Sequence, residues 1–434
     1  MLSKRDLDVR LVDQDGAAPL VVGKLDFGAE KTVAIYSHYD GQPVNQPNWV
    51  NDPWTPTLHA GIAEDGAPRV ESISDVDEAD YRLYARCTSD DKAPTQALCS
   101  ALDLLGDDRP ACNLLVITEG EEESGSTNFQ DLLAKVPETE NVDAWLICDG
   151  PVHPSRKQQV IFGARGVVSL QMTVYGPSRT LHSGHFGNWI PNPAMRLVHL
   201  LSSMRDDRGF VTIDAYSDRV LKLTAEEIQA IDAMPANDAT LLEELGVNGP
   251  EDGESGLSLS TMRPAINLHG IQAGHVRNEA TNAIMQTAHS SMDIRLVPDQ
   301  TVAQVREDIE RHVEKQRYHI VKQDPEKEAL RNHEKVVKME WGHGYEAART
   351  PLSSPFAQSL IKAAKHHKKD LVVNPMLGGS VPISKIVATA DKPAAILPIA
   401  NHDNNQHGAN ENIRIQNLID GILLYKTVLK NLTL

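Results

Sequence analysis

The chain has 434 residues, with 42 basic and 60 acidic side chains and a formal net charge of −18. Hydrophobic residues make up 41% and charged residues 24%, which is typical of a globular protein of about two or three domains. The acidic balance argues against nucleic-acid partners and anionic membranes, and no run approaches the roughly 18 apolar residues that span a bilayer.

The cysteines and the N-terminal residues bear on the cellular compartment. Cys87, Cys99, Cys112 and Cys148 are scattered and form no CxxC pair, which suits free thiols in a reducing compartment. The first residues, MLSKRDLDVRLVDQDG, lack the apolar core of a signal peptide. We therefore expect a cytoplasmic protein.

Short apolar runs alternate with helical stretches, a pattern typical of an α/β core. Buried strands are predicted over residues 32–37, 113–118, 143–148 and 395–400. Residues 82–85 are expected to form a short strand that leads into a helix over 93–105, with Asp90 or Asp91 as its N-cap. The expected core is a mixed, mostly parallel sheet flanked by helices.

The middle third of the chain has a different pattern. Residues 167–175 and 290–297 alternate apolar and polar side chains, as half-buried antiparallel strands do, and residues 300–316 have helical periodicity. The acidic stretch 226–245 is predicted to be helical, and 248–256 to be an exposed loop. We expect residues 164–343 to form an inserted α+β domain, ferredoxin-like in architecture. Residues 1–163 and 344–434 would form the first domain, which resumes with a helix over 355–366.

Polar side chains follow each predicted core strand. His38 and Asp40 follow the first strand, Glu122 and Glu123 the second, Asp149 the third, and His407 lies a few residues beyond the fourth. In open α/β sheets the ligand crevice lies outside the carboxyl ends of the strands. Each residue alone is better explained as a cap, a turn or a solvated charge. The four strand ends and Asp90, at the mouth of its helix, make five such elements at matching positions, and together they predict a metal site.

Carboxylates and imidazoles without a thiolate suit Zn²⁺, and Mn²⁺ or Co²⁺ as alternatives. Two ions about 3.5–4 Å apart need a bridging carboxylate, for which Asp90 is the natural candidate. His38 and Asp149 would complete the ligands of one ion, and Glu123 and His407 those of the other. If the backbone is extended at the Glu122–Glu123 pair, Glu123 would face the metal while Glu122 faces the water as general base. Asp40 would accept a hydrogen bond from the second ring nitrogen of His38.

Eight segments resemble, in order, the motifs of the M20 metallopeptidase family, and most of all its dipeptidase branch with carnosinase-type enzymes. They are HYDGQPV, ARCTSDDKAP, EGEEESGS, ICDG, LHSGHFGN, IRLVP, GGSVP and QHGANEN. The resemblance implies an amide hydrolase with two divalent metal ions, a catalytic domain and an inserted lid through which two chains dimerise. It implies the same ligands and the same base, and the choice between Glu122 and Glu123 rests partly on it.

The resemblance also implies substrate contacts. His182, otherwise a turn residue, would stabilise the oxyanion, reaching across the dimer, and Asn282 would have a similar polar role. Arg295, otherwise an ion-pair partner of Asp293, would bind the substrate's C-terminal carboxylate. Gly379 and Ser380, otherwise a flexible turn, would form a backbone nest beside that carboxylate.

The chain departs from the family pattern in two places. A glycine-rich segment is expected before Asp90, where this chain has Arg86-Cys87-Thr88-Ser89. Family members have several tens of mostly helical residues before the strand at 10–13, whereas this chain begins almost at that strand, which would expose apolar surface on the catalytic domain and weakens the inference about compartment.

The sequence therefore predicts a dinuclear metal-dependent hydrolase that cleaves the amide bond of a dipeptide or short peptide, with Glu122 activating a water between two metal ions. Two alternatives are an N-acyl amino acid deacylase or desuccinylase with the same metal centre, and a catalytically silent metal-binding protein. The expected partners are a small peptide and a second copy of the chain.

Overall fold

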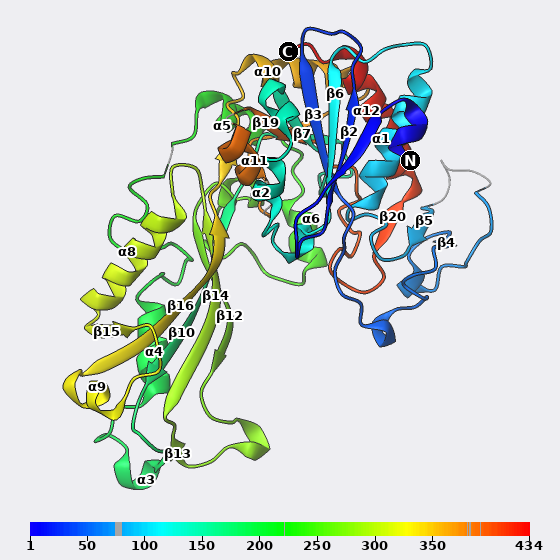
Figure 1. Ribbon diagram of the computed structural model, residues 1–434. Coiled ribbons are helices and arrows are strands. Elements are labelled where there is room, and N and C mark those ends of the chain that lie inside the picture. The colour runs from blue at the N-terminus through cyan, green and yellow to red at the C-terminus, as the bar shows by residue number, and fades with distance from the viewer. Residues whose placement is uncertain (74–79, 221, 380, 382, 391) are drawn as a thin grey trace.

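The structure is a computed structural model that describes residues 1–73, 80–220, 222–379, 381, 383–390 and 392–434. An eight-stranded mixed sheet forms the larger half of the molecule (Figure 1). In sheet order its strands are β1 (Asp8–Val12), β2 (Leu20–Leu25), β6 (Asn113–Glu119), β3 (Thr32–His38), β7 (Ala144–Ile147), β19 (Ala394–Ile396), β8 (Gln159–Ile161) and β18 (Val372–Asn374). The four central strands, β6, β3, β7 and β19, are parallel to one another. The predicted mixed sheet and its four core strands are confirmed.

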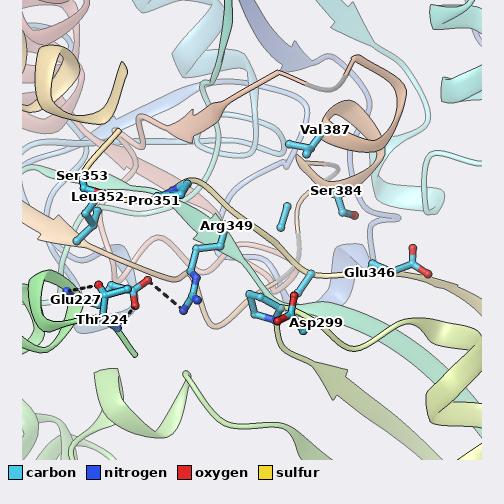
Figure 2. A pocket seen from close by; sticks show the side chains of 13 residues that line it. Thr224, Glu227, Asp299, Glu346, Arg349, Pro351, Leu352, Ser353, Ser384 and Val387 are labelled. Carbon is cyan, nitrogen blue, oxygen red and sulfur yellow. Dashed lines mark hydrogen bonds and ion pairs between the residues drawn. The ribbon is translucent and has the colours of Figure 1, made fainter. Parts of the chain in front are cut away.

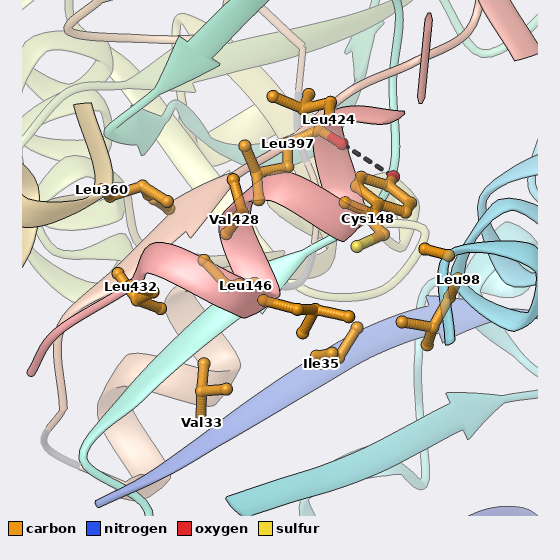
Figure 3. Close-up of a cluster of buried hydrophobic side chains, with 14 of the residues drawn as sticks. Val33, Ile35, Leu98, Leu146, Cys148, Leu360, Leu397, Leu424, Val428 and Leu432 are labelled. Atoms are coloured by element: carbon orange, nitrogen blue, oxygen red, sulfur yellow. Dashed lines mark hydrogen bonds between the residues drawn. The ribbon is translucent and has the colours of Figure 1, made fainter. Parts of the chain in front are cut away.

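Helices cover both faces of this sheet because its central strands are apolar on both sides. On one face Val33 and Ile35 pack in a cluster with side chains of α1 (Lys92–Leu105), α10 (Pro355–Lys365) and α12 (Ile415–Asn431), and Figure 3 shows part of this cluster. On the other face Ala34 and Tyr36 pack with α2 (Phe129–Leu133) and α11 (Ile383–Ala390). These two apolar layers fix the central strands and therefore their carboxyl ends.

A five-stranded sheet extends away from the larger one (Figure 1). In sheet order its strands are β12 (Ala265–Gln272), β14 (Thr287–Leu296), β10 (Gly166–Tyr175), β16 (Lys335–Tyr345) and β15 (Tyr318–Val321). The helices α4 (Pro193–Ser202) and α8 (Val302–Lys315) contribute to a hydrophobic cluster of its own on one face. The predicted strands at 167–175 and 290–297 and the helix within 300–316 are confirmed.

Short elements complete the chain. Three small sheets pair β4 (Thr57–His59) and β20 (Asn412–Arg414) with β5 (Arg82–Tyr84), β9 (Gly163–Ala164) with β17 (Ala348–Arg349), and β11 (Leu181–His182) with β13 (Ala283–Ile284). The remaining α-helices are α3 (Ser183–Phe186), α5 (Ala225–Asp232), α6 (Asp238–Glu244), α7 (Leu257–Ser260) and α9 (Lys327–Asn332). The 3₁₀ helices are η1 (Leu2–Arg5), η2 (Gln46–Asn48), η3 (Ala63–Asp65), η4 (Glu122–Ser124), η5 (Pro137–Asn141) and η6 (Arg277–Glu279).

The two large sheets are joined where β9 and β17 run side by side. A cavity of about 540 Å³ lies at this junction and is lined by residues of β17, α5 and α11 (Figure 2). Arg349 of β17 forms an ion pair with Glu227 of α5, with Nη1 and Oε1 3.0 Å apart and both side chains buried. This ion pair holds α5 against β17.

Two predicted elements differ in extent from those observed. The strand predicted over residues 395–400 ends at Ile396, because Pro398 has no N–H to donate to a neighbouring strand. The acidic stretch 226–245 forms two helices, α5 and α6, because Pro235 interrupts it. Among the residues that the structure describes, no helix is long and apolar enough to cross a bilayer.

Candidate metal centre

The carboxyl ends of the central parallel strands bring acidic and histidine side chains to one edge of the sheet. His38 is the last residue of β3, and Asp149 comes two residues after the end of β7. Asp90 precedes α1, which packs against β3. The predicted strand ends therefore meet, as the rule for open α/β sheets requires.

Two groups of side chains in this cluster could each hold a metal ion. His38, Asp90 and Asp149 form one group, and Asp90, Glu123 and His407 form the other; within each group the ligand atoms lie within 4.8 Å of one another. Nε2 of His38 lies 3.0 Å from Oδ1 of Asp90, and Nε2 of His407 lies 3.3 Å from Oδ2 of the same residue. Asp90 thus presents one oxygen to each group, as a bridging ligand would.

Asp40 links the histidine to the glutamate pair. Its Oδ1 lies 3.2 Å from Nδ1 of His38, and its carboxylate accepts hydrogen bonds from the backbone N–H groups of Glu122 (3.3 Å) and Glu123 (3.0 Å). Gln42, which the sequence analysis did not single out, donates from Nε2 to Oε2 of Glu123 at 2.8 Å. One aspartate therefore orients the imidazole of His38 and also holds the backbone that carries both glutamates.

The electrostatics of the cluster are dominated by crowded negative charge. Burial and the charge of Asp90 raise the pKa of Asp149 to about 6, and burial with the charges of Asp149 and Asp90 raises that of Glu122 well above its usual value. Burial lowers the pKa of His38, but hydrogen bonds to Asp40 and Asp90 outweigh it and raise that pKa. Hydrogen bonds to Asp90 and Glu123 raise the pKa of His407 to about 10. These raised pKa values mean that, without a bound cation, the crowded carboxylates are neutralised by protons on the acids and histidines of the cluster.

This donor set fits divalent cations. Carboxylate and imidazole ligands suit Zn²⁺, and the excess of carboxylates over basic groups favours a doubly charged ion. Binding of such ions would displace the protons that the cluster otherwise retains. The same chemistry accommodates Mn²⁺ or Co²⁺.

One local expectation was wrong, and a second holds for the position of the residue but not for its hydrogen bonding. The backbone at Glu122 and Glu123 is not extended, because these residues form the 3₁₀ helix η4 after β6 ends at Glu119. Asp91 occupies the N-cap position of α1, but its side chain makes no capping hydrogen bond. Instead, its Oδ2 accepts a hydrogen bond from the backbone N–H of His38 at 3.0 Å. The second aspartate of the pair therefore supports β3 and not the helix.

Cys87 stands in the segment where the resemblance predicted glycine. It has a φ of 64°, in the left-handed region that favours glycine. Its thiol fits against Gly41, where an added Cβ would lie only 2.2 Å from Sγ of Cys87. Burial raises the pKa of this thiol, so it stays protonated at neutral pH. The side chain is thus accommodated by a glycine on the neighbouring loop.

The residues predicted to bind the substrate carboxylate lie at the carboxyl end of β14 and in the segment around Gly378. Nε of Arg295 donates to Oδ2 of Asp293 at 2.5 Å, so the local ion pair is present. Arg165 donates from Nε to the carbonyl of Gly378 at 3.0 Å, and burial together with the charge of Arg295 lowers the pKa of Arg165 to about 10. Gly379 follows directly and is exposed. Ser380 lies outside the described residues.

A cavity of about 870 Å³ adjoins these residues. Arg165 and Ala265 line it, and Ala265 is the direct cross-strand partner of Arg295 in the β12–β14 pairing. Thr261 also lines it, and its Cγ2 would lie 2.9 Å from a Cβ at Gly378. Arg165 therefore borders this cavity directly, whereas Arg295 and Gly378 are next to residues that line it, Ala265 and Thr261.

His182 and Asn282 lie together but away from the acidic cluster. His182 pairs with Ala283 across β11 and β13, and the N–H of Ser183 donates to the carbonyl of Asn282 at 2.9 Å. Figure 1 shows α3 and β13 at the end of the five-stranded sheet opposite the eight-stranded sheet. Both residues are exposed. Within one chain, the structure does not bring them to the candidate metal ligands.

The sequence analysis gave no role to two polar residues next to the cluster, Arg86 and Glu411, or to Arg165, which lies beside Gly378. Glu411 lies four residues after His407, within the same quoted segment, QHGANEN. Its proximity to a predicted ligand was the available signal. The sequence alone could not predict its hydrogen bonds to residues 87–90, which are more than 300 positions away along the chain.

Comparisons with known proteins agree with these observations. The chain is 28% identical over 446 residues to a Cys-Gly metallodipeptidase, dug1, of Schizosaccharomyces pombe, covering 99% of this chain and 87% of the relative. It is 26% identical over 422 residues to the Beta-Ala-His dipeptidase of Homo sapiens, covering 94% and 76%. Among solved structures it resembles an M20 family metallo-carboxypeptidase, Sso-CP2, of Sulfolobus solfataricus, with a TM-score of 0.79 and 25% identity, covering 99% and 91%.

The family match extends over nearly the whole chain. Residues 34–431 match Peptidase family M20/M25/M40, a span that contains every predicted ligand and the five-stranded sheet. The resemblance stated from the eight motifs is thereby confirmed. This chain belongs to peptidase family M20/M25/M40.

Proposed function

We propose that this protein is a dinuclear metal-dependent dipeptidase. The observation that carries the proposal is the pair of ligand groups that share Asp90, with the half-buried Glu122 beside them. His38, Asp90 and Asp149 would hold one divalent ion, and Asp90, Glu123 and His407 the other, with zinc favoured by the donor set. The Cys-Gly and Beta-Ala-His dipeptidases among the relatives support a dipeptide as substrate.

The chain's own side chains would divide the work of hydrolysis. Bound divalent ions supply Lewis-acid polarisation of the scissile carbonyl and acidify the attacking water. Glu122, whose pKa is raised by burial and by neighbouring carboxylates, is suited to take a proton from that water and return it to the leaving amine. Asp40 would keep His38 oriented through Nδ1.

The substrate would be held from the five-stranded sheet. Arg295 would bind the C-terminal carboxylate, with Gly379 and Ser380 beside it, and the adjoining cavity leaves space for the neighbouring side chain. His182 and Asn282 would act on the oxyanion from the partner chain, since in their own chain they lie at the far end of the sheet (Figure 1).

This division of labour implies the domain organisation and assembly. Residues 1–163 and 344–434 would form the catalytic domain, and residues 164–343 a lid that also forms a homodimer interface. The exposed side chains along β12, at the edge of its sheet, are available for such an interface. The four free, buried cysteines suit a cytoplasmic location.

A paired substrate screen tests the proposal. Protein stripped with a chelator and reloaded with Zn²⁺, Mn²⁺ or Co²⁺ is offered dipeptides, beginning with Cys-Gly and β-Ala-His, and matched N-acyl amino acids. Release of two free amino acids in the reloaded protein alone is the expected result. Release of a carboxylic acid and one amino acid would favour the deacylase, and no turnover with full metal content would favour a silent metal-binding protein.

A further inference from the structure

Glu411 is a completely buried carboxylate, with no exposed surface, that is not part of either ligand group. Its Oε1 accepts hydrogen bonds from the backbone N–H groups of Ser89 (2.9 Å) and Asp90 (3.0 Å) and from the Ser89 hydroxyl (3.0 Å). Its Oε2 accepts from the N–H of Cys87 at 2.9 Å and from Nη1 of Arg86 at 2.8 Å. Five donors converge on one carboxylate, which is how a buried charge is stabilised in place.

Arg86 connects the same two segments in the opposite direction, from residues 86–90 to residues 407–411. Its Nη2 donates to the carbonyl of Gly408, next to His407, at 2.8 Å. Its side chain is 3% exposed, and its guanidinium lies 5.1 Å from the centre of the Trp49 ring. Residues 86–90 and 407–411 are thus joined by reciprocal hydrogen bonds, and we call the pair Arg86 and Glu411 the loop clasp.

The loop clasp joins the two segments on which the shared centre depends. The first segment ends in Asp90, which contributes to both ligand groups, and Glu411 binds the backbone N–H of that residue directly. The second carries His407, which has a φ of 63°, in a region that non-glycine residues adopt only with support from their surroundings. Loss of the loop clasp would free both segments to move relative to each other.

We propose that Arg86 and Glu411 are positioning residues that set the spacing between Asp90 and His407, and with it the ability of the site to hold two metal ions at once. This inference rests on the metal centre of the proposed function. Partners that orient metal ligands typically contribute about 10–100-fold to metal affinity. The second ion, held by Asp90, Glu123 and His407, would be the one more weakened, because both ends of its ligand set belong to the clasped segments.

Glu411→Gln is the direct test. The amide keeps the size of the side chain but places an NH₂ group, which accepts no hydrogen bond, where two or three donors converge, so at least two of the five hydrogen bonds must be lost. The full-length protein is stripped of metal and titrated with Mn²⁺, with calorimetry for affinity and stoichiometry and electron paramagnetic resonance for coupling between two bound Mn²⁺ ions. We expect the weaker Mn²⁺ Kd to rise about 10–100-fold and the coupled signal to diminish.

The matched control is Glu227→Gln, which alters another buried Arg–Glu pair, with Arg349, at the junction of the sheets (Figure 2). It is expected to lower Tm while leaving both Mn²⁺ Kd values within about twofold of wild type, because distant sites behave independently. If Glu411→Gln does not fold, Arg86→Lys is used, since a lysine cannot span both Glu411 and the Gly408 carbonyl. We expect the same direction of change in Kd.

Unchanged Mn²⁺ affinities and coupling in a folded clasp variant would overturn the proposal, even if Tm falls as in Glu227→Gln. The metal measurement does not depend on hydrolysis. A wild-type protein that binds two coupled Mn²⁺ ions but cleaves no peptide would contradict the proposed function alone, whereas an active wild type with an unaltered Glu411→Gln centre would contradict only the role of the loop clasp.

Discussion

His182 and Glu122 can be separated genetically, and we predict that two inactive variants restore activity to each other. In one chain, His182 directly precedes α3, which lies at the end of the five-stranded sheet opposite the eight-stranded sheet (Figure 1), and Glu122 follows β6 of the eight-stranded sheet. If the partner chain supplies the histidine, His182→Ala and Glu122→Gln homodimers should each be inactive. A mixed dimer would keep one intact site, with Glu122 from one chain and His182 from the other, while its second site lacks both groups.

The size of the recovery follows from this geometry. Random subunit exchange in a symmetric dimer makes about half of the dimers mixed, and each mixed dimer has one working site of its two. Activity should therefore approach roughly a quarter of wild type if the sites are independent. The assay is dipeptide hydrolysis before and after exchange, with metal content measured in both variants and exchange followed by differently labelled subunits.

Two results would refute the reasoning. One is a failure to recover activity although labelled subunits have demonstrably exchanged and both variants hold metal. The other is full wild-type activity in a form shown by sedimentation to be strictly monomeric. Either result would mean that His182 acts within its own chain or not at all.

Three further predictions concern binding, pH and stability. Arg295→Lys should raise KM about tenfold with little change in kcat, because a lysine cannot bind a carboxylate through two parallel hydrogen bonds; steady-state kinetics measure this. Burial raises the pKa of Asp403, but its interactions with Asn401, Arg82 and Arg414 outweigh burial and hold this pKa below the usual range. The ionised carboxylate therefore stabilises the fold fully above about pH 4, and this stabilisation decreases as the pH falls below that value. Urea unfolding of metal-free Asp403→Asn should therefore show a deficit at pH 7 that shrinks near pH 3, whereas a constant deficit would argue against ionisation as the cause. Leu146→Ala, at a position 2% exposed, should lower the free energy of unfolding by about 2–5 kcal/mol in the same assay.

The elements predicted from the sequence were those with strong local patterns. The run at residues 32–37 is apolar at every position but the ends because both faces of β3 are covered, and the structure places β3 at Thr32–His38. The helix predicted over residues 93–105 is α1, at Lys92–Leu105. Boundaries failed where one residue decides the outcome, as Pro235 does between α5 and α6.

The candidate site was predictable only in part. Parallel strands have a common carboxyl edge, so side chains that follow them could be expected to meet, and His38, Asp90 and Asp149 do lie together. The 3₁₀ turn at Glu122 could not be expected, because it depends on the Asp40 carboxylate accepting its backbone N–H groups. Glu411 was missed for the same reason: its role lies in hydrogen bonds to a segment far away along the chain.

The central claim is that two metal ions bind independently of the general base that uses them, and Glu122→Gln tests it most directly. Metal content and hydrolysis of the best dipeptide are measured on the same preparation of this variant and of wild type, with Glu123→Ala as the ligand control. The account predicts two divalent ions per chain in Glu122→Gln with a rate lowered at least about 10²-fold, and loss of metal in Glu123→Ala. Near-normal turnover by Glu122→Gln, or full metal content in Glu123→Ala, would contradict it.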